Sequence, residues 1–331
     1  MGKILTISIA AYNVQETIER ALDSLLDPRV NDVLEIFVVD DGGKDETLTI
    51  AKRYAELYPN TVFPIHKENG GYGSTINASL ARATGKYFKQ LDGDDWFLKE
   101  NFVEFIDVLK KTDVDCVISE VADFYAGSEK QEIKEAHPNI TEGLHSFADT
   151  EFSSVITMHG SAIKTEILQN NNIHIIEKCF YSDTELVVLP MPYLNTFYMF
   201  KKAVYVYYIG AEGQSMSLSG IEKHYPDHEK VYWELVEAYN TIPKEQLNKR
   251  NMVLMRLAKE AVYQFEFFCC LPICREHMRE LKDFGNKIRR DHPDIYQATR
   301  NRRRMTRILW DTGYLAYPLI AHKTRNKYQN R

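Results

Sequence analysis

The chain has 331 residues, of which 44% are apolar and 27% charged, as in an ordinary soluble globular protein with a large core. A net charge of −6 excludes a general binder of polyanions, and the five cysteines include no Cys-x-x-Cys pair, which argues against a zinc site or a disulfide framework. No stretch reaches the roughly 20 apolar residues of a membrane span, and no signal peptide precedes the first strand, so we expect a cytoplasmic protein.

Strand and helix patterns alternate over the first third of the chain. The apolar runs expected as strands are residues 4–9, 36–39, 62–66, 87–91 and 114–119, and the helical patterns are 18–26, 48–58, 73–83 and 102–109. Asn13 and Glu16 have the spacing of a capping box at the start of the first helix. Strands that are apolar throughout are buried on both faces, which predicts an α/β fold with a mostly parallel sheet covered by helices.

The pattern changes beyond about residue 125. We expect residues 127–150, which are polar, to form a loop, residues 204–209 a strand, and the chain from Ile221 onward to be mostly helical. Residues 287–331 hold twelve Lys or Arg and three Asp, a net charge of +9 that leaves −15 for the rest. A basic tail is most often a solvated surface, but it also suits an anionic lipid surface or a phosphorylated acceptor.

The most informative segment is an acidic run at residues 89–96, Lys-Gln-Leu-Asp-Gly-Asp-Asp-Trp. Asp92, Asp94 and Asp95 repel one another unless a cation lies between them, and carboxylate oxygens suit Mg²⁺ or Mn²⁺, which often also bind a substrate phosphate. The ordinary alternative is a solvated turn in which Asp94 or Asp95 caps the next helix. An EF-hand is excluded because Trp96 and Phe97 occupy positions that require a ligand and a glycine.

Polar residues follow three of the expected strands, at residues 11–13, 40–41 and 92–94. Ligands of open α/β sheets bind beyond the carboxyl ends of the strands, so we expect these sites side by side along one sheet edge. Asp40 and Asp41 fit either a turn or an acceptor of hydrogen bonds from a nucleotide. The run Gly-Gly-Tyr-Gly at 70–73 matches a dinucleotide loop poorly, and we interpret it as a tight loop that lets backbone approach a ligand.

Three further sites are ambiguous by residue type alone. The run Tyr-Ser-Asp-Thr-Glu at residues 181–185 is typical of a helix N-terminus, because Ser and Asp are favoured caps. By residue type alone, we interpret His159 and the polar pair at 214–215 as structural residues.

Four segments together resemble the inverting glycosyltransferase family 2, which has the GT-A fold. They are residues 7–13, 38–42, 69–87 and 91–95, in the family's order and spacing. The resemblance is strong over about residues 3–125 and looser through residues 158–159, 164–168 and 181–185 to about 217. It implies a GT-A catalytic domain at 1–218, with a nucleotide-sugar-binding half (1–125) and an acceptor-side half (126–218). A helical C-terminal region with a basic tail follows at 219–331.

The resemblance implies a role for individual residues. Asp183 would be the catalytic base, although Ser182 stands where the family usually has Glu, and Asp92 and Asp94 would form the Asp-x-Asp element that holds Mn²⁺ or Mg²⁺ on the donor diphosphate. The implied donor-binding residues are Ala10, Tyr12, Glu16, Asp40, Asp41, Gly71, Asp92 and Gly93. The implied acceptor or loop contacts are His159, Glu185, Gln214 and Ser215. Ala211 replaces a basic residue common in similar sequences, so we expect no side-chain clamp on the diphosphate from that loop.

The resemblance therefore implies a metal-dependent inverting glycosyltransferase that uses a nucleotide-diphospho-sugar, most simply a UDP-sugar, and a hydroxyl acceptor. The expected partners are a saccharide or lipid-linked acceptor of cell-surface polysaccharide or glycolipid synthesis and the inner membrane face through the basic tail, with a homodimer left open and no nucleic acid. Two alternatives remain. One is a haloacid-dehalogenase-like phosphatase that uses Asp92 and Asp94, against which Trp96 counts. The other is an inactive nucleotide-sugar-binding scaffold, which Ser182 and Ala211 favour.

Overall fold

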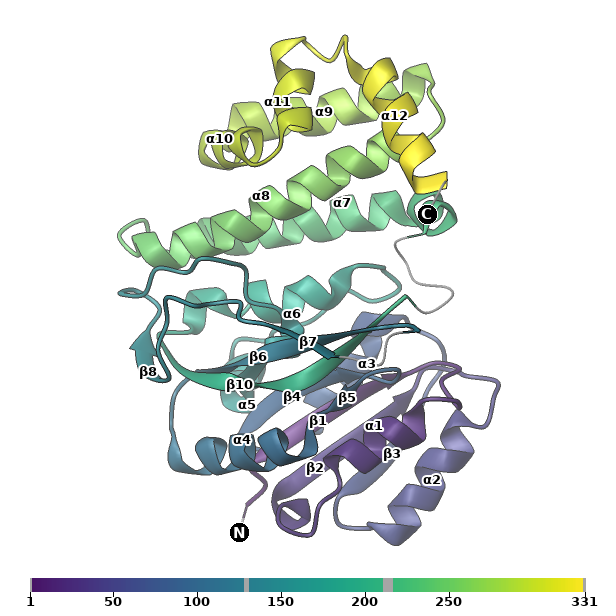
Figure 1. Cartoon of the computed structure of the whole chain (residues 1–331), viewed down its shortest axis with the longest axis vertical. Coiled ribbons are helices and arrows are strands. Elements are labelled where there is room, and N and C mark those ends of the chain that lie inside the picture. Colours follow the sequence, from purple (N-terminus) through teal and green to yellow (C-terminus); the bar gives the residue numbers. More distant parts are fainter. Residues whose placement is uncertain (1, 128–130, 211–216, 330–331) are drawn as a thin grey trace. The chain divides into compact units, whose positions relative to one another are not determined.

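A computed structural model describes residues 2–127, 131–210 and 217–329 of the chain. The chain folds as two compact units, Met1–Ala211 and Glu212–Arg331. Figure 1 shows the α/β elements of the first unit and the helices of the second.

The first unit is built on a curled mixed sheet, which has ten strands in the described part of the chain. Its strand order is β3-β2-β1-β4-β9-β6-β10-β5, with β7 paired to β6 and β8 to β10. The strands are β1 (Leu5–Ala11), β2 (Leu34–Asp40), β3 (Val62–His66), β4 (Tyr87–Asp92), β5 (Trp96–Phe97), β6 (Cys116–Tyr125), β7 (Gln131–Lys134), β8 (Gly143–Ser146), β9 (Ser161–Lys164) and β10 (Thr196–Ile209). Strands β1 to β4 are parallel, as expected, and β6 is parallel to β10. The other pairs, including both pairs of β9, are antiparallel, so the sheet as a whole is mixed, while the parallel arrangement expected from the first strands is found in β1 to β4.

Helices cover both faces of this sheet (Figure 1). They are α1 (Ile18–Leu25), α2 (Thr47–Leu57), α3 (Tyr72–Leu80), α4 (Lys99–Lys111), α5 (Thr165–Asn170) and α6 (Glu185–Val188). The main core lies where α1, α2 and α4 pack on the sheet, and it includes Ile7 and Ile9 of β1 and Leu22 of α1. The alternate residues Thr6 and Ser8 of β1 are also fully buried. Burial on both faces explains why the strand sequences are apolar in long runs.

The expected capping box is wrong. Helix α1 begins at Ile18, its N-cap residue Thr17 makes no side-chain capping bond, and Asn13 has a left-handed backbone with φ 54°. The Asn13 side chain instead accepts a hydrogen bond from the backbone N–H of Lys44. The next two residues are bonded to the start of α2 and the residues before it. The backbone N–H of Val14 donates to Thr47 Oγ1, and that of Gln15 donates to Asp45 Oδ2. Tertiary contacts therefore delay the start of the helix.

The expected loop at 127–150 is also partly wrong, because it contains strands β7 and β8. Both are short antiparallel strands, and their large apolar residues Ile133 and Leu144 are exposed by 61% and 70%. Such strands bury too little surface to give the alternation that would predict them. Strand β10 is longer than the expected 204–209, since it begins at Thr196.

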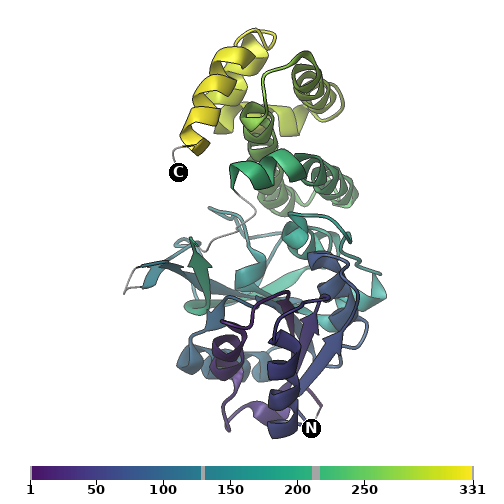
Figure 2. The same cartoon turned by 90° about the vertical axis from the view of Figure 1, so that its right-hand side faces the viewer.

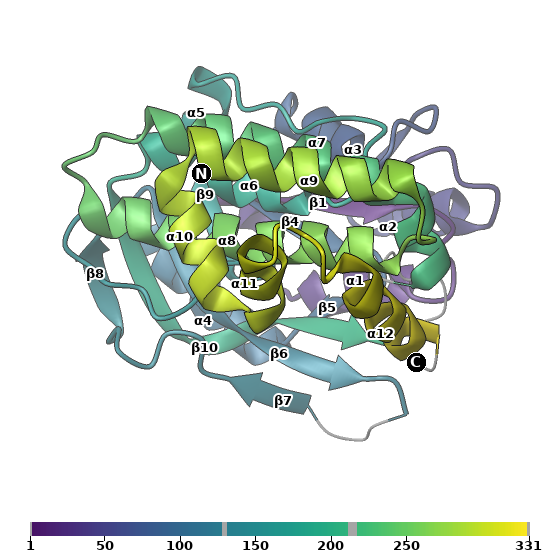
Figure 3. The ribbon, with the colours of Figure 1, turned by 90° about the horizontal axis from the view of Figure 1, so that it is seen from above.

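The second unit is helical from residue 218 onward, as expected. Its helices are α7 (Leu218–Thr241), α8 (Leu247–Cys270), α9 (Arg275–Asp291), α10 (Pro293–Arg302), α11 (Arg304–Asp311) and α12 (Tyr317–Gln329). Helix α8 packs against α7, α10 and α12. Figure 3 shows these helices from above, and Figure 2 shows α12 in yellow near the C-terminus. Among the described residues, no helix has the length and apolar character needed to cross a membrane. All five cysteines are free, and Cys269 and Cys270 are buried.

A charged cluster is buried between α7 and α8. The Glu260 carboxylate lies 3.3 Å from His228 Nε2 and accepts a hydrogen bond of 3.1 Å from Arg256 Nη1. Burial by itself raises the pKa of Glu260, but these two partners outweigh it and hold the pKa at about 2. The cluster keeps Glu260 ionised in the interior of the second unit.

Candidate active site

The carboxyl ends of three parallel strands meet at one edge of the sheet, as expected. Ala11 of β1 lies opposite Asp40 of β2, and Ala10 of β1 lies opposite Asp92 of β4. This register brings residues that are about 30 and 80 positions apart in the sequence into adjacent places. The prediction of a shared polar edge is confirmed, and Figure 1 shows the strands β1, β2 and β4 that form it.

The acidic turn, residues 92–95, is fixed against β1 through its glycine. The backbone N–H of Gly93 donates to Ala10 O at 3.0 Å, and Thr17 Oγ1 donates to Gly93 O at 2.7 Å. A Cβ atom on Gly93 would lie 2.9 Å from both Ala10 O and Val14 Cγ2, which is too close for any side chain. Neither Asp94 nor Asp95 caps α4, because the N-cap residue of that helix is Leu98.

The half-buried Tyr72 and the fully buried Tyr205 hold the carboxylates of the acidic turn. Tyr72 Oη donates to Asp92 Oδ1 at 2.6 Å, and Tyr205 Oη donates to Asp95 Oδ2 at 2.5 Å. The same Tyr205 oxygen accepts from the backbone N–H of Asp92 at 3.2 Å. The backbone N–H of Tyr208 donates to the second oxygen of Asp95, which is 1% exposed. Asp95 is thus turned inward with both oxygens in use.

The three carboxylates are crowded in a poorly solvated place. Burial raises the pKa of Asp92 to about 7, and the charges of Asp94 and Asp183 add to the rise. Burial likewise raises the pKa of Asp95 to about 9, helped by Asp92 and Asp94. The pKa of Asp94 is also raised by burial, against the opposing effect of Arg20. A bound cation would stabilise all three ionised forms, so this donor set fits a divalent metal.

His159 joins the acidic turn from a 3₁₀ turn, Met158–Gly160. Its Nε2 atom lies 3.9 Å from Asp92 Oδ2, and its ring packs on Tyr205 and Tyr207 with centroid distances of 4.7 and 4.8 Å. Ligand atoms of Asp92, Asp95 and His159 all lie within 4.8 Å of one another. This group differs from the predicted pair, since it contains Asp95 rather than Asp94.

Asp94 is less buried than Asp95. Its side chain is half-buried, and its backbone oxygen accepts a hydrogen bond of 2.6 Å from Arg20 Nη2. The Arg20 guanidinium lies over the Trp96 ring, 3.9 Å from the ring centroid. Arg20 therefore fixes the backbone of Asp94, whose side chain remains partly accessible.

Asp40 and Asp41 are both buried and bonded within the protein. Asp40 accepts from the backbone N–H of Gly43 at 3.0 Å and lies 2.6 Å from His66 Nδ1. Asp41 accepts from the backbone N–H groups of Gly70 and Gly71 at 2.9 and 2.8 Å, with Lys67 as a further donor. The Asp40 oxygens retain acceptor capacity, whereas Asp41 Oδ1 is used by three donors and the main task of Asp41 is to hold the glycine loop.

The glycine loop approaches protein backbone, and its expected approach to a ligand stays a prediction. A Cβ atom on Gly73 would lie 2.2 Å from Ile176 O, and one on Gly71, whose φ is 79°, would lie 3.2 Å from the backbone of Lys178. Asn77 adds two hydrogen bonds to the backbone of Ile175. The loop and α3 therefore anchor residues 175–178.

The anchored segment leads directly to Asp183. Asp183 is part of a 3₁₀ turn, Ser182–Thr184, which follows Tyr181 in a left-handed conformation and packs against α3. Its charge raises the pKa values of Asp92 and Tyr72, so it lies in the same electrostatic environment as the acidic turn. Glu185 is 1% exposed and accepts a hydrogen bond from the backbone N–H of Ile176, so it braces the segment from inside.

The remaining predicted residues lie around the sheet edge or outside the described residues. Ala10 is half-buried beside Asp92, and the Tyr12 side chain just beyond β1 is 52% exposed. Glu16 is exposed and accepts a hydrogen bond from Gln15 Nε2. Gln214 and Ser215 lie outside the described residues.

Comparison with known proteins gives the family. The sequence matches the family described as "Glycosyl transferase family 2" over residues 6–171, half of the chain. The chain belongs to glycosyl transferase family 2. This membership displaces the phosphatase alternative.

Individual family 2 relatives cover different parts of the chain. The minor teichoic acid biosynthesis protein GgaB of Bacillus subtilis is 27% identical over 235 residues, which are 68% of this chain and 25% of that protein. The chain spans from a quarter to about half of the length of the curated relatives it matches first.

Solved structures share the fold. S. aureus TarS 1-349, solved in complex with UDP, is 18% identical, with a TM-score of 0.64 over 98% of this chain and 88% of that one. The mannosyltransferase PcManGT of Pyrobaculum calidifontis, solved with GDP-Man and Mn²⁺, is 14% identical, with a TM-score of 0.53 over 98% and 87% of the two chains. The expected GT-A fold is confirmed.

Several site residues escaped the sequence reasoning. Tyr72 and Tyr205 bond the acidic turn, Arg20 fixes Asp94, and Lys89 lies fully buried beneath the site. Tyr72 lies within the glycine run and Lys89 within the acidic run, so close attention to those motifs could have found both. Tyr205 is 110 positions from Asp95, and nothing in the family 2 pattern points to it.

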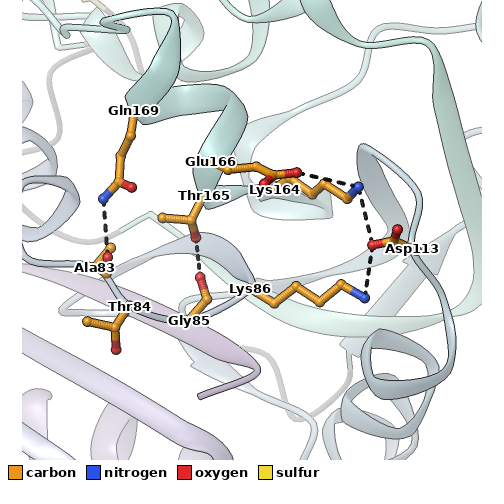
Figure 4. Close-up of a pocket in the computed structure, with 9 residues that line it drawn as sticks. All are labelled: Ala83, Thr84, Gly85, Lys86, Asp113, Lys164, Thr165, Glu166 and Gln169. Carbon is orange, nitrogen blue, oxygen red and sulfur yellow. Dashed lines mark hydrogen bonds and ion pairs between the residues drawn. The ribbon is translucent and has the colours of Figure 1, made fainter. Parts of the chain in front are cut away.

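A separate cavity of about 390 Å³ lies at the opposite end of β4 from Asp92 (Figure 4). Lys86 and Lys164 both pair with Asp113 at 3.2 Å, and Lys164 also pairs with Glu166. These two cations and two carboxylates balance one another, so we assign the cavity no part in the family 2 chemistry.

Proposed function

We propose that this chain is a metal-dependent inverting glycosyltransferase that moves a sugar from a nucleotide-diphospho-sugar to a hydroxyl acceptor. The observation that carries the proposal is the common environment of the acidic turn and Asp183 at the carboxyl ends of β1 and β4. The nucleotide is proposed to be uridine diphosphate, because TarS was solved with UDP and with UDP-GlcNAc and its fold matches nearly the whole chain.

The cation is proposed to be Mn²⁺ or Mg²⁺, held by Asp92 and Asp94. The half-buried Asp94 carboxylate can share the cation with a diphosphate, whereas both oxygens of the fully buried Asp95 already accept hydrogen bonds from Tyr205 and Tyr208. Asp95 would therefore orient the acidic turn, and His159 would flank Asp92. When bound, the cation stabilises the negative charge that develops on the leaving diphosphate.

Asp183 is proposed to be the general base. Its carboxylate takes the proton of the acceptor hydroxyl while the acceptor oxygen attacks the anomeric carbon and the bond to the diphosphate breaks. Attack on the face opposite the leaving group inverts the anomeric centre without a covalent enzyme intermediate. The segment anchored on the glycine loop keeps Asp183 in place while the acceptor binds.

The donor base is proposed to lie along Ala10, Tyr12 and Asp40. The half-exposed Tyr12 ring offers a flat apolar surface for a base, and Asp40 retains acceptor capacity for a base N–H. Gly71, Gly93 and Asp41 then shape the surrounding loops.

The biological setting is proposed to be cell-surface polysaccharide synthesis at the cytoplasmic membrane face, with a saccharide or lipid-linked acceptor. The relative GgaB, a teichoic acid biosynthesis protein, supports this setting. The second unit also exposes Leu315 and Leu319 by 80% and 79%, followed by exposed Lys323 and Lys327 on α12. Exposed leucines beside lysines suit an anionic lipid surface.

A thermal-shift panel of nucleotide sugars with and without Mn²⁺ tests the proposal. A donor at a hundred times its Kd stabilises the fold by about 2.7 kcal/mol, which raises Tm by roughly 5–10 °C for a unit of this size. We expect this rise for a UDP-sugar with Mn²⁺ and a smaller one without it. If no nucleotide sugar raises Tm in the presence of Mn²⁺, the proposed function is wrong.

A further inference from the structure

Strand β4 carries a lysine in the middle of the first unit. Lys89 is 0% exposed and lies three residues before Asp92 on the strand that leads into the acidic turn. Burial lowers its pKa to about 7, which shows how strongly this environment opposes the charge. A buried amine is tolerated only where hydrogen bonds and other polar contacts compensate for lost water.

The contacts of the Lys89 amine are few and specific. Its Nζ atom donates to His159 O at 2.6 Å and to Ser161 O at 3.2 Å. Three aromatic rings surround the same atom, with centroids 5.6 Å away for Phe97, 5.9 Å for Phe105 and 5.8 Å for Tyr205. Carbonyl oxygens and ring faces are the groups that stabilise a buried amine without a counter-ion.

Two of these partners belong to the candidate active site. His159 is the residue whose imidazole lies 3.9 Å from Asp92, and Lys89 holds the backbone of that same residue. The Tyr205 hydroxyl bonds both Asp95 and the backbone N–H of Asp92. The Lys89 amine therefore contacts both the backbone of His159 and the ring of Tyr205, the two residues that flank the acidic turn.

The 3₁₀ turn Met158–Gly160 also contacts Asp92 by a second route. Tyr72 Oη, which donates to Asp92, lies 3.0 Å from Met158 Sδ. Movement of this turn would thus displace both His159 and the hydrogen-bonding environment of Tyr72. Lys89 is bonded to the carbonyl at the middle of that turn.

We propose that Lys89 is a positioning residue, whose amine fixes the turn 158–160 and the Tyr205 ring so that Asp92 is presented to the cation in one orientation. The inference rests on the proposed function, and it adds a residue outside the Asp-x-Asp element and the base. Lys89 touches neither donor nor acceptor in this arrangement.

A purely structural role makes a different prediction. Methionine has nearly the same length as lysine, and removal of a buried charge that has no counter-ion among the described residues offsets part of the cost of the two lost hydrogen bonds. Lys89→Met should therefore keep the fold, while the carbonyls of His159 and Ser161 lose their donor. Loss of positioning without loss of stability separates the two roles.

The experiment compares Lys89→Met with Lys86→Met, both in the full chain. Lys86 is a matched control, because its Nζ also donates to a backbone carbonyl, Thr112 O at 2.6 Å, but at the opposite end of β4 beside the cavity in Figure 4. We expect the Kd for Mn²⁺, measured by titration calorimetry, to rise at least tenfold in Lys89→Met with little change in Tm. Lys86→Met should bind Mn²⁺ like the wild type. An unchanged Kd in Lys89→Met, or a lower Kd, would overturn the inference.

A second readout does not depend on the cation. The imidazole NMR signals of His159 in the metal-free protein should shift or broaden in Lys89→Met and stay in place in Lys86→Met. If the wild type binds no Mn²⁺, the proposed metal site fails, and the His159 signals alone decide the role of Lys89: unchanged signals refute it. If Lys89→Met does not fold, Lys89→Gln, which keeps one donor, takes its place, and wild-type values of both readouts then refute the inference.

Discussion

Exchanging Asp94 and Asp95 for Asn, one at a time, tests which carboxylates bind the cation. Both residues follow Asp92 in the acidic turn, but their side chains have different surroundings. Asp95 is 1% exposed with each oxygen already accepting a hydrogen bond, whereas Asp94 is half-buried. We assign Asp94 to the cation and Asp95 to the orientation of the turn.

The expected magnitudes follow from these surroundings. Residues that orient a metal ligand without touching the metal typically change affinity by roughly 10–100-fold when replaced. Asp95→Asn should therefore raise the Kd for Mn²⁺ within about that range, and Asp94→Asn, which removes a charged ligand, by more than about 100-fold. Asp94→Asn leaves the hydrogen bond from Arg20 to the backbone oxygen in place, so the free energy of unfolding should change by less than about 0.5 kcal/mol.

Titration calorimetry with Mn²⁺ and the Mn²⁺ dependence of sugar transfer measure both variants. Asp107→Asn is the control, since Asp107 is an exposed carboxylate on α4 that pairs with Lys110. Abolished binding in Asp95→Asn together with near-normal binding in Asp94→Asn would move the cation to the group of Asp92, Asp95 and His159. Normal binding and transfer in both variants would refute a cation at the acidic turn.

Three further predictions concern the base, the second unit and the membrane. Asp183→Asn should lower kcat by roughly 10²–10⁴-fold, the usual contribution of a general base, with an unchanged donor Kd; an unchanged kcat would remove Asp183 from the mechanism. Acid should destabilise the second unit, because the pKa of Glu260, held at about 2 by its paired histidine and arginine against burial, lies below its ordinary value of 4.5. This stabilisation, roughly 3 kcal/mol, is complete above about pH 4.5 and is lost as the pH falls towards 2. The free energy of unfolding of Glu260→Gln, measured by chemical unfolding at pH 7, 5 and 3, should therefore depend less on pH than that of the wild type. An equal pH dependence in the two proteins would contradict the assignment. Leu315→Ser with Leu319→Ser should weaken binding to vesicles with anionic lipid about tenfold or more by sedimentation, and Leu247→Ser, a control 66% exposed on α8, should not; wild-type binding by the double variant would exclude this surface.

The parts of the fold that the sequence predicts are those with strong local patterns. Strand β3 has the predicted bounds, and β1, β2 and β4 differ by a few residues, because each is an apolar run between polar turns. The shared polar edge could also be predicted, since parallel strands with adjacent register bring their carboxyl ends together. These features depend on local composition and one general rule of α/β sheets.

The missed features depend on contacts between distant segments. The capping spacing of Asn13 and Glu16 is real in the sequence, but the bond from Val14 to Thr47 outweighs it. Tyr205 supports the acidic turn only because β10 pairs with β5 and β6. No local pattern reports such pairings, so the residues beneath the site become visible only in the folded chain.

The glycine loop shows how one motif can serve the donor side and the acceptor side together. Asp41 at the end of β2 accepts from the backbone N–H groups of Gly70 and Gly71. A side chain on Gly73 would collide with the carbonyl of Ile176, so the loop and the segment leading to Asp183 pack backbone against backbone. The strand end proposed to face the donor is thus linked, through the Asp41 carboxylate and the glycine loop, to the segment that carries the proposed base. Side-chain changes such as Ser182 can then be tolerated nearby without moving Asp183.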